Sequence, residues 1–469
     1  VLTDPADTGA VCLALPQDVE GEAYEYPEVF FQRRVHRLQR RPPEKEAVAL
    51  AAERVREARK PLLICGGGVR YSEAHEAFAH FAERFNIPFG ETQAGKSALV
   101  WNHPLNLGGI GVTGTQPANI LAKEADLIIG VGTRYTDFTT ASKWLFNDRA
   151  KFLNINVSPF QAMKMEALPL IADARMGLEA LNDALGDYRS GYSDEIGKAL
   201  DDWEKELSRL DGMVYDETHP PLINDRNADS AGRYARDLGS ALTQTAALGA
   251  LNRLIPKDAV VIGSSGSLPG DMQRMWRPKT PDSYNMEYGY SCMGYEVSGA
   301  LGQKLAADGK EVYSMVGDGS FVMLHSELLT AVQEKLKINI CLFDNAGFGC
   351  INNLQIGQGN ESLCTELRYR SESGRHDGSF LAVDYARIAE GYGCIAFTIR
   401  TLAELEAAVK DALTIKGQPV LFDLKVLPKT MTDGYASWWR VGSVEVSRNP
   451  LNEVAWQEHL DHINNAKAY

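Results

Sequence analysis

Short apolar segments alternate with helix-length segments along most of this chain. Parallel strands need a crossover of about a dozen residues or more, usually a helix, so this alternation predicts parallel sheets covered by helices. The predicted class is α/β, with two parallel-sheet, three-layer domains. Strands are expected at 60–65, 126–131, 151–157, 258–262, 312–316, 338–343, 394–398 and 420–426. Helices are expected at 45–59, 72–85, 236–254, 294–307, 322–335, 381–391 and 402–413.

The pattern divides the 469 residues into six segments. The apolar run at 10–15 is interpreted as the last strand of an otherwise absent domain, and polar residues with prolines separate the two α/β units. The expected segments are that last strand at 1–20, a linker at 21–43, a Rossmann-like middle domain at 44–185, a connector with one helix at 186–235, a second α/β domain at 236–427, and a tail with a final helix at 428–469.

Charge and composition exclude several classes of function. The formal net charge is −14 and no basic run could neutralise a phosphate backbone, so nucleic acid is not an expected partner. No apolar stretch approaches the roughly 20 residues that span a bilayer, and the first residues lack a signal-peptide pattern, so we expect a cytoplasmic protein with no membrane partner. Seven cysteines without a C-x-x-C spacing argue against a disulfide framework or zinc site, and most are expected to be buried thiols.

Three glycine-rich loops could in principle hold a nucleotide. Residues 90–97 match the P-loop pattern, but no helix pattern begins at Lys96, and a P-loop needs one to direct amides at phosphate. Gly66–Gly68 and Gly130–Gly132 end strands and could approach a dinucleotide such as NAD, yet neither completes G-x-G-x-x-G. Tight strand-to-helix turns are the favoured interpretation of both.

A different pair of loops predicts a magnesium diphosphate site. Asp318 follows the strand expected at 312–316, and Asn345, 27 residues later, follows the next strand. One helix and one strand separate them, so both are expected at the carboxyl edge of a parallel sheet, where α/β proteins bind ligands. A carboxylate, an amide oxygen and the main-chain carbonyl near Gly347 are hard donors that suit Mg²⁺, and amides at Gly319 and Ser320 would hold the diphosphate. Two ordinary turns remain the alternative.

This Gly-Asp-Gly followed by Asn resembles the cofactor signature of thiamine-diphosphate-dependent enzymes. Further segments are most similar to the trihydroxycyclohexane-1,2-dione hydrolases of myo-inositol catabolism, namely residues 91–97, 317–327, 342–355 and 427–442. The resemblance implies thiamine diphosphate and Mg²⁺ as cofactors, the metal being held by Asp318, Asn345 and Gly347. It also implies that Met293 supports the bent cofactor and that the Ser291 carbonyl accepts from its amino group. The implied cofactor-binding set is Gly266, Ser267, Leu268, Ser291, Met293, Gly317, Asp318, Gly319, Ser320, Asn345, Gly347 and Phe348.

The implied reaction is hydrolytic carbon–carbon ring opening of 3D-(3,5/4)-trihydroxycyclohexane-1,2-dione to 5-deoxy-D-glucuronate, catalysed by a homodimer or homotetramer. In the family an N-terminal domain carries the glutamate that activates the cofactor. No residue here matches that glutamate, so no catalytic residue is assigned and the chain alone is expected to be inactive. His325, His376, Trp438 and Arg440 are further candidates for proton transfer or water positioning.

Two other interpretations remain open from the sequence. The same cofactor loops would serve a 2-oxoacid carboligase resembling acetolactate synthase, or a decarboxylase. The chain could also be an inactive fragment that keeps only the half of the site that binds Mg²⁺ and diphosphate.

Overall fold

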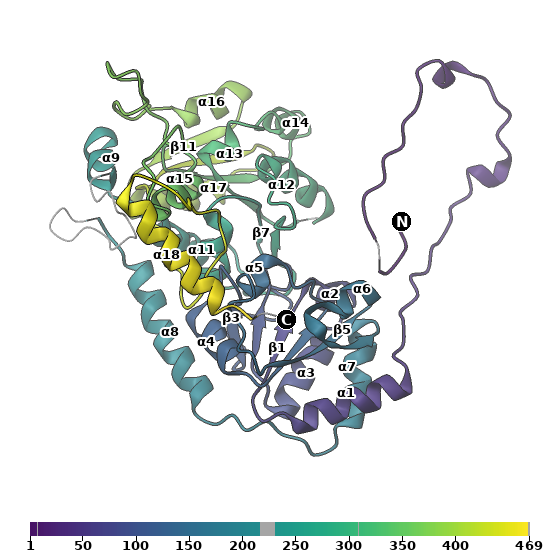
Figure 1. Cartoon of the computed structure of the whole chain (residues 1–469). Helices are drawn as coiled ribbons and strands as arrows, with labels where there is room; N and C mark the ends of the chain where they lie inside the picture. The colour runs from purple at the N-terminus through teal and green to yellow at the C-terminus, as the bar shows by residue number, and fades with distance from the viewer. Residues whose placement is uncertain (7, 216–229, 308, 468–469) are drawn as a thin grey trace.

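The computed structural model describes residues 1–6, 8–215, 230–307 and 309–467 and contains two six-stranded sheets, each entirely parallel. The sheets lie in separate lobes, the first at the bottom of Figure 1 and the second at the top. The predicted α/β class with two parallel-sheet domains is therefore confirmed.

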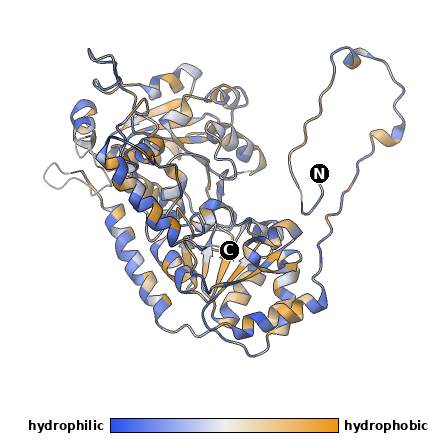
Figure 2. Ribbon diagram, viewed as in Figure 1, coloured by the Kyte–Doolittle hydropathy of each residue, from blue (hydrophilic) through white to orange (hydrophobic). Residues whose placement is uncertain are grey.

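The first sheet has the strand order β3-β2-β1-β4-β5-β6. Its central strands are buried along their whole length, as expected for a parallel sheet covered on both faces, and Figure 2 shows them as predominantly hydrophobic. The strands are β1 (Pro61–Cys65), β2 (Phe89–Glu91), β3 (Asn106–Gly109), β4 (Leu127–Val131), β5 (Lys151–Asn156) and β6 (Leu168–Ile171). The helices are α1 (Lys45–Glu57), α2 (Gly67–Tyr71), α3 (His75–Phe85), α4 (Gln116–Glu124), α5 (Asp137–Thr140), α6 (Pro159–Ala162) and α7 (Ala174–Ala184), with a 3₁₀ turn at Lys164–Glu166.

The second sheet has the order β11-β12-β10-β9-β7-β8, so β9 and β10 are direct neighbours. Its strands are β7 (Val260–Gly263), β8 (Tyr284–Met286), β9 (Val312–Gly317), β10 (Asn339–Asp344), β11 (Ile395–Ile399) and β12 (Val420–Lys425). Its helices are α10 (Gln244–Leu254), α11 (Leu268–Met275), α12 (Tyr295–Ala306), α13 (Asp318–Phe321), α14 (Glu327–Gln333), α15 (Gly349–Gly357), α16 (Tyr385–Tyr392) and α17 (Leu402–Ala412).

Alternate residues of the second sheet feed two hydrophobic cores. On β10, Cys341 and Phe343 pack with α10, α11 and α17, whereas Ile340 and Leu342 pack with α12, α14 and α16. Successive side chains of a strand point to opposite faces, so the two cores lie on opposite sides of the sheet. This lobe therefore has three layers, as predicted.

Four further segments connect or flank the lobes. Helix α8 (Glu195–Asp211) packs against both α4 and α10, and α18 (Pro450–Asn464) crosses from the second lobe toward the first, where Lys467 N–H donates to the Lys143 carbonyl. Helix α9 (Ser230–Leu238) precedes the second sheet. The first part of the chain extends away from both lobes, with short 3₁₀ turns at Val19–Gly21 and Glu28–Phe30 (Figure 1), and it meets the first lobe at Arg40, which pairs with Glu73 and Asp173.

Several predicted elements differ from the structure. The strand expected at 10–15 does not form, because that segment is exposed and pairs with no strand in the described residues. The helix expected at 236–254 is two helices: Gly239, at φ +65°, follows α9, and the Thr243 side chain caps α10 by accepting from Ala246 N–H. The helix expected at 322–335 is reduced to α14, which begins only after the short α13 and a turn.

The connector and the short strands also differ from expectation. Described residues of 186–235 contain α8 and the start of α9 rather than one helix, while the polar run at 224–229 lies outside the described residues. The strands β2, β3, β6 and β8 were not predicted, because each has only three or four residues and carries no clear two-residue periodicity.

The expectation that most cysteines are buried is wrong. All seven are free, and Cys65, Cys341 and Cys394 are buried, but Cys12, Cys292 and Cys364 are exposed in loops and Cys350 is half-buried on α15. No helix in the described ranges is both long enough and apolar enough to cross a membrane.

Candidate functional site

The ends of β9 and β10 bring Asp318 and Asn345 to one edge of the second sheet. Gly317, the last residue of β9, is in register with Phe343 of β10. Asp318 opens α13 directly after β9 and is fully buried, and its Oδ2 accepts a 2.7 Å hydrogen bond from Gly347 N–H in the loop after β10. The juxtaposition predicted from the spacing of the two loops is therefore present.

Two oxygens at this edge have no protein partner. Asp318 Oδ1 and Asn345 Oδ1 are both buried without a hydrogen bond from any described residue. Buried polar atoms are nearly always paired, so two orphaned acceptors in adjacent loops call for a ligand that takes electron pairs. A hard cation fits this requirement, because carboxylate and amide oxygens are ligands of Mg²⁺.

The electrostatics of Asp318 lead to the same conclusion. Burial, followed by the nearby Asp344 carboxylate, raises the pKa of Asp318 well above its usual range. A bound divalent cation would reverse this effect by favouring the charged carboxylate. The Asp344 carboxylate has a cationic partner, because Lys425 Nζ lies 2.6 Å from its Oδ2, and the same ammonium group lies 2.9 Å from Asp423 Oδ2. Asp318 has no such ion pair with a described residue, so a bound cation would supply the positive charge that it lacks.

Glycines shape the loops around this edge. A Cβ atom on Gly319 would lie 2.7 Å from the Phe348 ring, so the Phe348 side chain packs directly on the Gly319 backbone. A Cβ atom on Gly266 or Gly317 would meet nothing within 4 Å, and Gly266 has φ +86°. Both glycines therefore leave open space at the ends of β7 and β9, and both belong to the predicted cofactor-binding set.

The two predicted residues after Gly266 in the β7 loop, Ser267 and Leu268, have different environments. Ser267 lies at the start of α11, and its Oγ accepts from Gln244 Nε2 at 3.2 Å. The Leu268 side chain is buried in the core of the second sheet, so only its backbone could face a cofactor.

The loop before α12 contains Ser291 and Met293. Ser291 has φ +57°, which directs the chain sharply, and its Oγ lies 3.5 Å from the Ser264 carbonyl. The Met293 side chain is 38% exposed, so it is not a core residue and remains available to contact a ligand. Glu287 holds this loop, because its carboxylate accepts from Tyr290 N–H at 3.1 Å and Cys292 N–H at 2.8 Å.

One buried acid next to this loop was missed by the sequence analysis. Glu296, in the first turn of α12, is fully buried and contacts the β7 loop, the loop before α12 and α13. Its sequence signal is a lone acid among apolar and small residues. That pattern is also typical of an acid that interacts with the positive end of a helix, so it does not single out Glu296.

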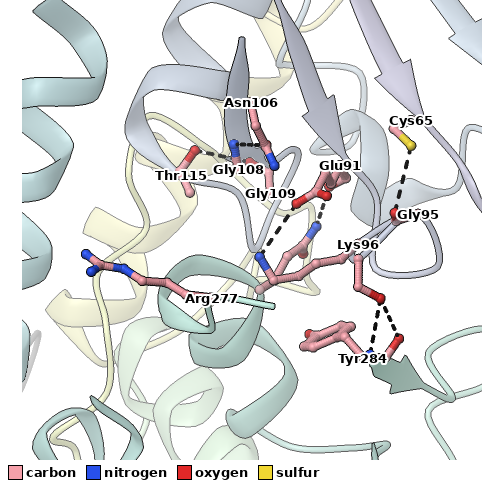
Figure 3. Close-up of polar contacts among 12 residues, drawn as sticks. Cys65, Glu91, Gly95, Lys96, Asn106, Gly108, Gly109, Thr115, Arg277 and Tyr284 are labelled. Atoms are coloured by element: carbon pink, nitrogen blue, oxygen red, sulfur yellow. Dashed lines mark hydrogen bonds and ion pairs between the residues drawn. The ribbon is translucent and has the colours of Figure 1, made fainter. Parts of the chain in front are cut away.

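The P-loop-like stretch at 90–97 has a structural role. No helix begins at Lys96, and its ammonium group is buried 3.7 Å from Glu91 Oε2 and 5.7 Å from the centre of the Tyr284 ring. Figure 3 shows these residues where the two lobes meet. A Cβ atom on Gly95 would lie 1.9 Å from the Cys65 carbonyl oxygen, so this glycine permits tight packing and the rejection of a P-loop is supported.

The other glycine loops pack on each other. Gly68 N–H donates to the Gly132 carbonyl at 3.0 Å, and a Cβ atom on Gly66 would lie 2.3 Å from the same oxygen. This geometry agrees with tight turns rather than with an open cradle between the two loops for a dinucleotide.

The remaining candidates have packing contacts. His325 stacks on Phe321, and Trp438 stacks on His462 of α18. His376 lies beside Arg370, and Arg440 N–H donates to Ser142 Oγ. These contacts assign none of the four residues a chemical role.

Comparison with known proteins identifies the family of this chain. Residues 48–181 match the profile of the thiamine pyrophosphate enzyme central domain, and residues 264–424 match the C-terminal TPP binding domain, which includes the whole Asp318–Asn345 edge. Proteins named 3D-(3,5/4)-trihydroxycyclohexane-1,2-dione hydrolase are 56% identical in Clostridium tetani, 57% in Geobacillus thermodenitrificans and 55% in Bacillus anthracis, each match covering 100% of this chain and 73% of the relative. The chain therefore belongs to the thiamine pyrophosphate enzymes, in the family of the 3D-(3,5/4)-trihydroxycyclohexane-1,2-dione hydrolases.

Proposed function

We propose that this protein uses thiamine diphosphate and Mg²⁺ to open the ring of 3D-(3,5/4)-trihydroxycyclohexane-1,2-dione, giving 5-deoxy-D-glucuronate in myo-inositol catabolism. The observation that carries the proposal is 55–57% identity, over the whole chain, to hydrolases named for that substrate. The orphaned oxygens of Asp318 and Asn345, within the matched TPP binding domain, support the cofactor assignment.

The chain's own residues have two tasks toward the cofactor. Asp318 Oδ1, Asn345 Oδ1 and the Gly347 carbonyl would hold Mg²⁺, while amides of Gly319 and Ser320 would bind the diphosphate. Gly266, Ser267 and the Leu268 backbone would line the diphosphate from the β7 side, where the space around Gly266 is open. Gly317 leaves room at the end of β9, and Phe348 supports the Gly319 backbone.

The loop before α12 would orient the organic part of the cofactor. The half-exposed Met293 would support its bent form, and the Ser291 carbonyl would accept from its amino group. When bound, thiamine diphosphate supplies a carbon nucleophile that adds to a carbonyl and accepts the electron pair when the adjacent carbon–carbon bond breaks.

The proposed reaction consumes one water molecule. Water adds to one carbonyl carbon of the dione, which becomes the carboxylate of the product. The bond between the two carbonyl carbons breaks, and the other carbon takes a proton and becomes the aldehyde at the opposite end of the same open chain. The chain has to hold the ring and admit water.

We also propose that the protein is a homodimer or homotetramer. Large apolar side chains are exposed beside the cofactor loops, and a Cβ atom on Gly294 would lie 2.9 Å from Leu324 Cβ, which joins the loop before α12 to the turn after α13. Large apolar side chains that a single chain leaves exposed are candidates for burial against a second copy. In these loops and on α14 they are Tyr290, Met293, Val322, Met323, Leu324 and Leu329. The seven free cysteines support the reducing environment of the cytoplasm as its location.

The test is turnover by the full-length gene product with Mg²⁺ and thiamine diphosphate. The cyclic dione and pyruvate are supplied separately, and products are followed by NMR. We expect a carboxylate and an aldehyde from the dione only when both cofactors are present. Turnover of pyruvate alone would instead identify a carboligase or decarboxylase and overturn the proposed substrate.

A further inference from the structure

We propose that Glu296 is a positioning residue that fixes the relative placement of the three loops expected to hold thiamine diphosphate. The inference rests on the proposed cofactor site and extends it to a residue outside the metal and diphosphate ligands. The loops follow β7, precede α12 and follow β9, so they lie far apart in the sequence.

Each loop donates to the same carboxylate. Glu296 Oε1 accepts from Ser265 N–H at 3.3 Å and from Ser265 Oγ at 3.2 Å. Glu296 Oε2 accepts from Gly294 N–H at 3.1 Å and from Ser320 Oγ at 2.8 Å. Glu296 itself is fully buried, so these donors replace the water that the charged group has lost.

The donors leave little freedom in the arrangement. The Ser320 hydroxyl donates its proton to Glu296 and its oxygen accepts from Gly294 N–H at 2.7 Å. The Ser320 side chain therefore points into the junction between loops, and its backbone amide is the group left to face a diphosphate. Gly294, at φ +91°, sets the path from Met293 into α12.

A carboxylate next to a phosphate-binding site needs a specific reason. A negative charge close to a diphosphate repels it, so an acid with no role there would weaken cofactor binding. The Glu296 carboxylate instead accepts four hydrogen bonds from the neighbouring loops, and the β7 loop, which supplies two of them through Ser265, continues into Gly266. The acid thus orders the backbone that the cofactor is expected to contact.

Glutamine has nearly the same shape as glutamate but a different set of hydrogen-bonding atoms, so Glu296→Gln tests the role of the carboxylate. Glu296→Gln keeps the shape but replaces one acceptor oxygen with an amide donor, which then faces existing donors. We expect the loops to lose their common anchor and the affinity for the cofactor to fall, although the buried helix stays in place.

Ser314→Ala is the matched control. Ser314 is fully buried on β9 and its Oγ donates to the Glu296 main-chain carbonyl at 3.0 Å, so the variant also removes a buried hydrogen bond at this residue. It leaves the carboxylate and the three loops unchanged. The control therefore measures how far the loss of a buried hydrogen bond near Glu296 lowers stability without any change to the carboxylate.

Thiamine diphosphate is titrated at saturating Mg²⁺ into the full-length gene product by calorimetry, and cofactor-free thermal unfolding is recorded for each variant. We expect Glu296→Gln to weaken the Kd about tenfold to hundredfold, because a buried acceptor is lost from several donors. Ser314→Ala is expected to change the Kd by less than about threefold while lowering the unfolding midpoint comparably, by a few degrees. The KM for the cofactor is expected to rise with the Kd, with a smaller change in kcat at saturation.

An unchanged Kd in Glu296→Gln would overturn the inference. If that variant does not fold, Ser265→Ala is titrated instead, because it removes one loop's hydroxyl from the intact carboxylate. A Kd weakened about fivefold would then support the inference and an unchanged Kd would refute it. Asp318→Asn tests the proposed cofactor site separately from the role of Glu296. If this variant binds thiamine diphosphate as tightly as the wild type, the cofactor site is misplaced, whatever the result for Glu296→Gln.

Discussion

Asp318→Asn is expected to change stability in opposite directions with and without cofactor. In the cofactor-free protein the Asp318 carboxylate is fully buried and its Oδ1 lacks a protein partner. Asparagine keeps an oxygen that can accept from Gly347 N–H but removes the uncompensated charge. A buried charge with no cationic partner, next to the Asp344 carboxylate, opposes folding, so its removal is expected to stabilise the cofactor-free protein by about 1–3 kcal/mol.

The magnitude converts to a measurable shift. One kcal/mol moves the unfolding midpoint of a domain of 150–250 residues by about 2–4 °C, so Asp318→Asn should raise it by about 2–12 °C in EDTA. In the wild type, cofactor at about 100 times its Kd adds about 2.7 kcal/mol, or about 5–11 °C. The variant is expected to lose most of that second increment, because its metal ligand is neutral.

The assay is thermal unfolding of the full-length gene product, first in EDTA and then with Mg²⁺ and thiamine diphosphate. Asp411→Asn, an exposed acid on α17 of the same lobe, makes the same chemical change away from the site and should leave both midpoints within about 1 °C. A variant at Asp318 that retained the full cofactor-dependent shift would refute the reasoning about the metal.

Three further predictions concern buried charged groups of the two lobes. Arg274→Met should destabilise the protein by about 2–4 kcal/mol in thermal unfolding, because the buried guanidinium donates to the Val112 and Gly114 carbonyls and to Thr432 across the lobes; an unchanged midpoint would contradict this role. Lys96→Met should cost about 3–5 kcal/mol by leaving Glu91 buried and unpaired, and adding Glu91→Gln should restore part of that loss. Burial raises the pKa of Asp423 to about 6, so its ionisation opposes folding as pH rises from about 4 to 6. The midpoint of Asp423→Asn relative to wild type should therefore rise across that interval, and a flat difference would exclude the pKa shift.

The sequence predicted the metal edge because its signal is local and its geometry is general. Gly-Asp-Gly and Asn345 each follow an apolar strand, and consecutive parallel strands end at one edge of a sheet. No knowledge of side-chain packing is needed for that inference. The two cores of the second sheet follow in the same way from strands long enough to show buried runs.

Glu296 could not be found by the same reasoning. Its partners Ser265, Gly294 and Ser320 come from three loops, and only the folded chain shows that their donors converge on one carboxylate. The short strands could not be predicted for a related reason. Strand β8 has three residues, and it is defined by its pairing with β7 rather than by its composition. The prediction of a strand at 10–15 was wrong because an apolar run forms a strand only where a neighbouring strand is available to pair with it.

The central claim is that the loops after β9 and β10 form the metal and diphosphate site. Crystals of the full-length gene product grown with thiamine diphosphate and Mn²⁺ in place of Mg²⁺ would locate the ion by anomalous scattering. We expect a single peak within coordination distance, about 2.0–2.2 Å, of Asp318 Oδ1, Asn345 Oδ1 and the Gly347 carbonyl oxygen. A peak elsewhere, or cofactor density without an ion at these three oxygens, would contradict the account.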